Sequence, residues 1–218
     1  MKRKFVFGMG TGCCGTSSLA YLLNSQQGAF VGHELFPILP WSTDEEARAF
    51  FIENKWEQLN HESHLYSLVG DVASYYLPYA RFLMYNLDSL KDEVDFKFIV
   101  LQRNKEEVIN SFLSKFKRQN NNPLQIKKSF SIREDKWDSS FPKYDDAASI
   151  KECIEWYYDD YYAEVDFLLN RWPDNFRMYD INDLNNDKKV FELLRFVGIE
   201  VPEIIIARKN KKEDATIF

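Results

Sequence analysis

Cysteine is scarce in this 218-residue chain, which holds Cys13, Cys14 and Cys153. Such an odd, low number gives no disulfide framework and suits a reducing compartment. Long apolar runs are also missing, since no stretch approaches the roughly 18 consecutive apolar residues of a transmembrane helix. The basic start MKRK meets glycines too early to form the apolar segment of a secretory signal. We therefore expect a cytoplasmic protein with no transmembrane segment.

The sequence has no excess of positive charge. Its 28 Lys and Arg residues against 34 Asp and Glu give a net charge of -6, which argues against a nucleic-acid-binding protein. A small anionic ligand remains possible, because it needs only a few local charges. Hydrophobic residues make up 45% and charged residues 28%, an ordinary globular balance. The length fits one domain over 1–218.

Apolar segments typical of buried strands alternate with segments of helical periodicity. Strands are expected at 4–9, within GAFVGHELFPILPW, at 65–73, at 95–103 and in FRMYDIN. Helices are expected at 16–24, 44–58, 77–90, 104–116, 149–172 and 187–197. This alternation predicts an α/β fold with a central, mostly parallel sheet flanked by helices. We expect a polar lid or loop at 117–146 and a mobile, charged tail at 207–218.

A glycine-rich loop joins the first strand to the first helix. Gly10, Gly15, Thr16 and Ser17 have the spacing G-x-x-x-x-G-T-S, a phosphate-binding loop with threonine where a nucleotide-hydrolysing protein has lysine. Backbone N–H groups at a helix N-terminus, together with the helix dipole, bind phosphate or sulfate without that lysine. Its absence argues against ATP or GTP hydrolysis. The alternative is a tight turn with a purely structural role.

A second group of polar residues lies in FIVLQRNKEEVINSF. Arg103 ends the predicted strand and Ser111 lies on the helix that follows. Ligands of open α/β sheets bind at the carboxyl ends of the strands, and a guanidinium suits bidentate contact with phosphate. Taken singly, Arg103 is equally consistent with a surface ion pair and Ser111 with a solvated helix position.

Together, GTGCCGTSSLAYLL and FIVLQRNKEEVINSFL resemble the two cofactor motifs of the sulfotransferases that use 3′-phosphoadenylyl sulfate (PAPS). HELFPILPW, VGDVASYYLPY and YDINDLNNDKKVFELLRFVGI are similar to further segments of that family. The resemblance implies a P-loop-like three-layer fold and a reaction that needs no metal. It implies that the 3′-phosphate of PAPS lies on Arg103 and Ser111. It implies that the 5′-phosphosulfate lies on Gly12, Cys13, Cys14, Gly15, Thr16, Ser17 and Ser18.

One position departs from the family pattern. The family usually has lysine or arginine where this chain has Cys13, and that cation helps to neutralise the leaving phosphate. Cys13 is then either a small filler or a reactive thiolate at a helix N-terminus. The sequence does not decide which residue supplies a substitute cation. The candidates are Lys4, Arg81, Lys115, Lys117 and Arg118.

The catalytic base is sought in GHELF. Glu34 matches the position of a catalytic glutamate in several family members, and its neighbour His33 titrates near neutrality. Alternatively, both side chains only brace the loop. Asp71, near the end of a predicted strand, could orient the substrate or serve as a second base, or it could only cap the next segment. The aromatic run EWYYDDYY is interpreted mainly as core packing.

The leading hypothesis is therefore sulfuryl transfer from PAPS to a hydroxyl or amine by in-line displacement, with 3′,5′-adenosine bisphosphate (PAP) as product. Three alternatives stay open: a P-loop kinase of small molecules or nucleotides, a catalytically impaired relative that binds PAPS or PAP, and a scaffold with a structural glycine loop. The acceptor is expected to be a small molecule or a carbohydrate. The sequence does not indicate an oligomeric state.

Overall fold

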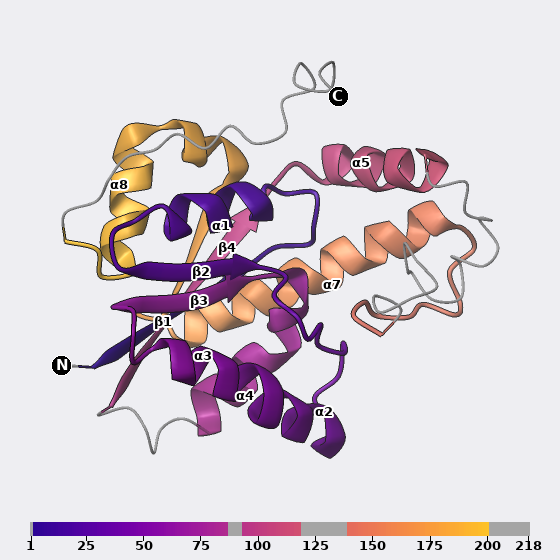
Figure 1. Cartoon of the computed structure of the whole chain (residues 1–218). Coiled ribbons are helices and arrows are strands. Elements are labelled where there is room, and N and C mark those ends of the chain that lie inside the picture. Colours follow the sequence, from indigo (N-terminus) through magenta and orange to yellow (C-terminus); the bar gives the residue numbers. More distant parts are fainter. Residues whose placement is uncertain (1, 87–92, 119–138, 201–218) are drawn as a thin grey trace.

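The computed structural model describes residues 2–86, 93–118 and 139–200. Five strands form one sheet in the order β2-β3-β1-β4-β5, and every neighbouring pair is parallel (Figure 1). Their bounds are Arg3–Met9 for β1, Ala29–His33 for β2, Leu68–Val72 for β3, Val94–Gln102 for β4 and Phe176–Asp180 for β5. The predicted α/β fold with a central parallel sheet is confirmed.

The helices between these strands lie close to the predicted segments. They are α1 Thr16–Asn24, α2 Glu45–Phe50, the π-helical η1 Phe51–Trp56, α3 Glu57–Glu62, the short η2 Ser74–Tyr76, α4 Leu77–Asn86, α5 Lys105–Arg118, α7 Ile150–Arg171, the short η4 Ile181–Asn185 and α8 Asp187–Phe196. Side-chain caps explain two of the starts. Asp44 accepts a hydrogen bond from the Ala47 N–H at 2.8 Å, and Ser149 accepts one from the Glu152 N–H at 3.2 Å.

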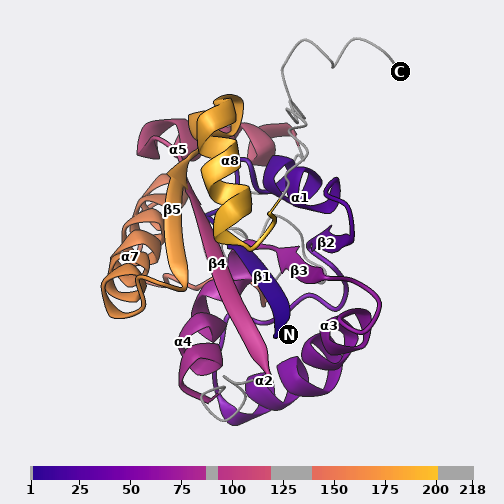
Figure 2. The ribbon, with the colours of Figure 1, turned by 90° about the vertical axis from the view of Figure 1, so that its left-hand side faces the viewer.

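Helices cover both faces of the sheet, which gives three layers (Figure 2). Phe5, Phe7 and Met9 of β1 pack into one core with α4 and α7, whereas Val6 packs into the other core with α1 and α8. Both faces of the strands are therefore buried, and this explains why β1 and β4 are nearly continuous apolar runs. Among the described residues, no helix is both long and apolar enough to cross a membrane.

Several boundaries differ from the sequence prediction: β3 starts at Leu68 where a strand was expected from 65, and the helical stretch expected to end at 58 continues to Glu62. The helix expected at 44–58 is interrupted by the π-helical segment η1, a geometry with no local sequence signature. The polar loop was expected to start at 117, but α5 continues to Arg118. Most of the predicted lid, 119–138, and the predicted tail, 207–218, lie outside the described residues.

The strand order determines where a ligand crevice can form. β1 is followed by α1 and leads to β2 on one side, whereas β4 is followed by α5 and α7 and leads to β5 on the other side. Neighbouring strands whose connections leave in opposite directions open a crevice at their carboxyl ends. The glycine-rich loop follows β1 and Arg103 follows β4, so both lie at the carboxyl edge where such a crevice is expected.

Candidate functional site

The loop between β1 and α1 has a backbone that few residue types tolerate. Gly12, Cys13 and Gly15 have φ values of 84°, 56° and 91°. Glycine adopts this left-handed region without cost, but Cys13 is uncommon there. Gly15 is the N-cap of α1 and has no side chain with which to occupy the first N–H groups of that helix. The loop therefore presents backbone donors at a positive helix end, the arrangement that binds an anion.

The two neighbouring cysteines differ in their surroundings. Cys14 is fully buried, and burial raises its pKa to about 12, so its thiol stays neutral at ordinary pH. It packs against Gly10, where an added methyl group would collide with the Cys14 sulfur. Cys14 thus faces the interior, and only its backbone N–H can take part in an anion site. Cys13 is partly exposed and packs against the core.

Arg103 connects the second predicted motif to the first. Its Nη1 donates a hydrogen bond to the Cys13 carbonyl oxygen at 3.0 Å, and its Nε donates to Glu107 Oε2 at 2.7 Å. The Arg103 side chain is 30% exposed, so it is held in place yet open to a ligand. Ser111 lies about two turns along α5 and is partly buried.

Four tyrosines of α7 form a second support that sequence reasoning missed. This α7 tyrosine cluster consists of Tyr157, Tyr158, Tyr161 and Tyr162, all buried. The Gly10 N–H donates to the Tyr161 hydroxyl at 2.8 Å. The hydroxyls of Tyr158 and Tyr162 donate to the carbonyl oxygens of Arg103 and Leu101, each at 2.8 Å.

The cluster therefore holds the backbone of both motifs, in addition to packing in the core as the sequence suggested. Burial also raises the pKa of each tyrosine in it. These phenols stay protonated at neutral pH and remain able to donate. Their spacing in the sequence gave no sign of partners so far away along the chain.

His33 and Glu34 lie beside the start of α1, where β2 ends. His33 Nε2 is 3.1 Å from Thr16 Oγ1 and 3.3 Å from Ser17 Oγ, within hydrogen-bond distance of both. On the other side of the ring, His33 Nδ1 is 3.8 Å from Glu34 Oε2. The Glu34 side chain is 33% exposed. A chain of polar contacts thus runs from the loop hydroxyls through the imidazole to a carboxylate that is open to solvent.

Asp71 has no access to a ligand. Its side chain is 0% exposed and lies 3.3 Å from the Lys55 ammonium, which is equally buried. It accepts a hydrogen bond from Tyr76 at 2.8 Å and from the backbone N–H of Leu35 at 3.2 Å. The proposal that Asp71 contacts substrate or acts as a second base is therefore wrong, because every neighbour of this carboxylate is a buried group of the protein itself.

Two of the suggested replacement cations are held elsewhere. Lys4, at the amino end of β1, donates to the Gly198 carbonyl oxygen at 2.7 Å, and Arg81 pairs with Glu164. Lys115 lies exposed on α5, and the side chains of Lys117 and Arg118 are outside the description. Across residues 2–86, 93–118 and 139–200, no group of three His, Cys, Asp or Glu side chains is arranged to hold a metal ion.

Comparisons with known proteins place the fold. No family model and no curated protein sequence matches the chain. A sulfotransferase from Alicyclobacillus acidocaldarius matches with a TM-score of 0.58 at 16% identity, over 98% of this chain and 88% of the other. A sulfotransferase domain from the curacin biosynthetic pathway matches with 0.56 at 12% identity, over 97% and 79%. A thymidylate kinase from Candida albicans matches with 0.47 at 13% identity, over 89% and 92%. At such identities the likeness shows the fold alone.

Proposed function

We propose that this chain is a sulfotransferase that moves a sulfuryl group from PAPS to a hydroxyl or amine of a small molecule or carbohydrate. The observation that carries the proposal is the hydrogen bond from Arg103 to the Cys13 carbonyl oxygen, which joins the two motifs of the sequence. An isolated glycine-rich loop is weak support for any function. A loop joined to an arginine that follows the neighbouring strand supports the proposal of a two-part anion site more strongly than either motif alone. The fold shared with two sulfotransferases agrees with it.

The residues present fit the two charged ends of the donor. The N–H groups of the loop at 12–15 and the hydroxyls of Thr16 and Ser17 suit the phosphosulfate, and the half-open guanidinium of Arg103 suits the 3′-phosphate. When bound, PAPS supplies an activated sulfuryl group. The sulfur–oxygen bond to the phosphate breaks while a bond from sulfur to the acceptor oxygen or nitrogen forms. The loop donors meet the negative charge that develops on the phosphate.

Glu34 is the proposed general base. Its carboxylate is partly exposed and takes the proton of the acceptor as the new bond forms. His33 fits this role less well, because its ring already lies between the loop hydroxyls and Glu34. We assign His33 the task of connecting the base to the loop.

Nucleotide binding tests the cofactor part of the proposal. Isothermal titration calorimetry should show saturable binding of PAP. ATP and AMP, which carry their phosphates at other positions than PAP, serve as competitors. Arg103→Ala should weaken PAP binding by roughly ten- to a hundredfold, on the scale of a lost charge-assisted hydrogen bond. Arg195→Ala is the matched control, because Arg195 lies on the surface of α8. Binding of ATP in preference to PAP would contradict the proposal and favour a kinase.

Turnover tests the catalytic part. PAP release from PAPS is measured with a panel of acceptors that includes a phenol, a sugar and a primary amine. Glu34→Gln should abolish turnover while it leaves PAP affinity unchanged, since the base does not hold the nucleotide. PAP binding by the wild-type protein with no turnover on any acceptor would instead indicate a binding protein.

A further inference from the structure

Leu35, the residue that follows Glu34, is held at both its backbone N–H and its carbonyl oxygen. The Leu35 N–H donates to both carboxylate oxygens of Asp71 at 3.2 Å. The Leu35 carbonyl oxygen accepts from the Lys55 ammonium and lies 3.4 Å from the Tyr75 hydroxyl, whose single proton is shared between this oxygen and Asp71 Oδ2. One residue earlier, the Glu34 N–H donates to the Val72 carbonyl oxygen at 3.1 Å. The backbone that carries the proposed base is therefore tied to β3 and to the helix containing Lys55.

The groups that make these ties are deeply buried. The Asp71 and Lys55 side chains are both 0% exposed, and Tyr75 and Tyr76 are buried as well. The hydroxyls of Tyr76 and Tyr75 donate to Asp71 Oδ2 at 2.8 Å and 3.3 Å. A buried ion pair is costly to desolvate and is weak evidence for stability. A role in fixing one local geometry explains better why such a pair is present.

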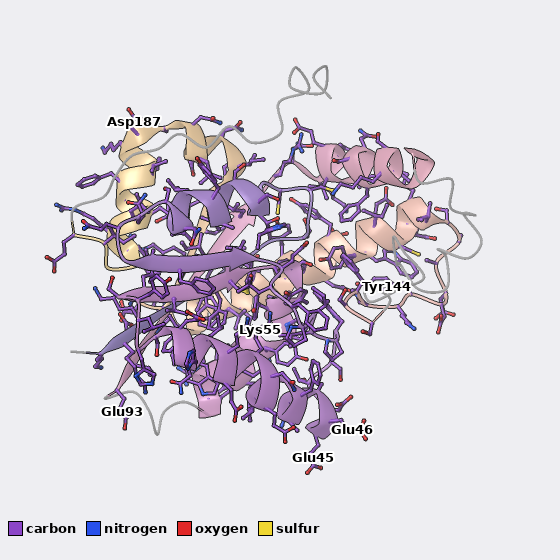
Figure 3. The ribbon with its side chains drawn as sticks, viewed as in Figure 1. Glu45, Glu46, Lys55, Glu93, Tyr144 and Asp187 are labelled. Atoms are coloured by element: carbon purple, nitrogen blue, oxygen red, sulfur yellow. The ribbon has the colours of Figure 1, made fainter. Side chains whose placement is uncertain are left out.

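The helical stretch between Glu45 and Glu62 is widened at the segment that contains Lys55. Ala47, Phe51, Lys55 and Leu59 recur every four residues and all four are buried, so the lysine occupies a position on the apolar stripe. Lys55 belongs to the π-helical segment η1, which lies between α2 and α3. Single π-helical turns inside α-helices occur frequently at functional sites. Figure 3 shows Lys55 on the side of this helical stretch that faces the sheet.

Glu34 itself has an unusual backbone. Its φ of 55° lies in the left-handed region that a residue with a Cβ seldom adopts. Such a conformation persists only where the surroundings determine it, and it is frequent at active sites. Here the surroundings are the bonds to Val72, Asp71, Lys55 and Tyr75. Release of these bonds would let Glu34 relax to an ordinary φ and would turn its carboxylate away from His33.

We propose that Asp71, Lys55, Tyr75 and Tyr76 form a positioning clamp, which fixes the backbone of Leu35 and thereby holds the Glu34 carboxylate beside His33. The four residues act through the backbone and do not contact the substrate. The role assigned to Glu34 rests on the proposed function, whereas the clamp itself is a property of the fold.

Tyr76→Phe is the variant of choice, because it removes the 2.8 Å hydrogen bond to Asp71 and keeps the aromatic ring. Tyr79→Phe is the matched control. Tyr79 is equally buried, and its hydroxyl donates to the Pro40 carbonyl oxygen at 3.0 Å, away from Asp71 and Leu35. Hydrogen–deuterium exchange, followed by mass spectrometry of peptides covering 33–36, reports on the Glu34 and Leu35 amides directly. We expect Tyr76→Phe to speed their exchange roughly tenfold and Tyr79→Phe to leave it unchanged.

Kinetics supply the second measurement. In Tyr76→Phe, kcat should fall about tenfold with KM for PAPS and affinity for PAP unchanged, because only the base is misplaced. Tyr79→Phe should keep the wild-type kcat. Unchanged exchange at 33–36 in Tyr76→Phe would overturn the clamp. Faster exchange with an unchanged kcat, or an equal fall in Tyr79→Phe, would overturn its positioning role.

These outcomes are separable from failure of the proposed function. If the wild-type protein neither binds PAP nor turns over PAPS, the proposed function fails on that result alone. The exchange experiment still decides whether the clamp holds the Leu35 peptide, because it needs no ligand.

Discussion

Removal of one hydroxyl from α7 should loosen the start of the glycine-rich loop. Tyr161 is 1% exposed, accepts from the Gly10 N–H at 2.8 Å and donates to the Ser74 carbonyl oxygen at 3.3 Å. Tyr161→Phe keeps the ring but leaves a buried N–H without its partner. A buried donor left unsatisfied costs about 1–3 kcal/mol. For a chain of this size, that loss corresponds to a fall in Tm of about 2–12 °C.

Thermal and urea unfolding of the wild type, Tyr161→Phe and Tyr85→Phe measure this effect. Tyr85 is 55% exposed, so the same chemical change at that position should alter the free energy of unfolding by less than about 0.5 kcal/mol. Calorimetry with PAP should also show a loss of affinity in Tyr161→Phe, because Gly10 opens the loop that is proposed to hold the 5′-phosphate end of the nucleotide. Equal stability of the two variants would refute the inference that Tyr161 supports the loop.

Three further predictions concern charge at the site and in the α7 tyrosine cluster. Burial raises the pKa of Tyr157 and Tyr161, so the folded state keeps phenolic protons that the unfolded chain releases above pH ~10. The free energy of unfolding is therefore unaffected by these groups below that pH. It should fall by about 1 kcal/mol per tyrosine between pH 10 and 11. Urea unfolding at pH 9, 10 and 11 measures this, and a flat profile would contradict it. Cys13→Lys should tighten PAP binding about tenfold or more, because it places a charged donor at this position, whereas Cys13→Ser should leave PAP binding unchanged. Equal PAP affinities of the two variants in calorimetry would argue against a phosphate beside this position. Glu107→Gln removes the exposed ion pair of Arg103 and should therefore tighten PAP binding about twofold. Weaker PAP binding of this variant in calorimetry would count against Arg103 as a phosphate ligand.

Local patterns were sufficient to predict the elements that position the site. Alternation of apolar and helical segments gave the parallel sheet, and the glycine spacing located the loop that precedes α1. These features depend on residues close together in the chain, for which periodicity and capping preferences are informative.

Such local patterns could not predict the residues that hold the backbone of the site in place. Tyr161 and Gly10 are 151 positions apart, so no local signal links the phenol to the loop. The sequence does contain a signal for the burial of Lys55, because Lys55 falls in register with Phe51 and Leu59 on a buried stripe of the helix. Asp71 looked like a residue of the ligand edge because it lies near the end of β3. Its burial depends on partners from three other segments, which the sequence alone does not bring together.

The reliance of both motifs on α7 has a consequence for dissecting the protein. Residues 1–118 already contain the loop, Glu34 and Arg103, so a short fragment would carry every residue proposed to touch the nucleotide. That fragment would lack the hydroxyls that satisfy the Gly10 N–H and the carbonyl oxygens of Leu101 and Arg103. The proposed anion site is therefore not a portable module, and any transplant of it into another scaffold must include the distant helix that holds its backbone in shape.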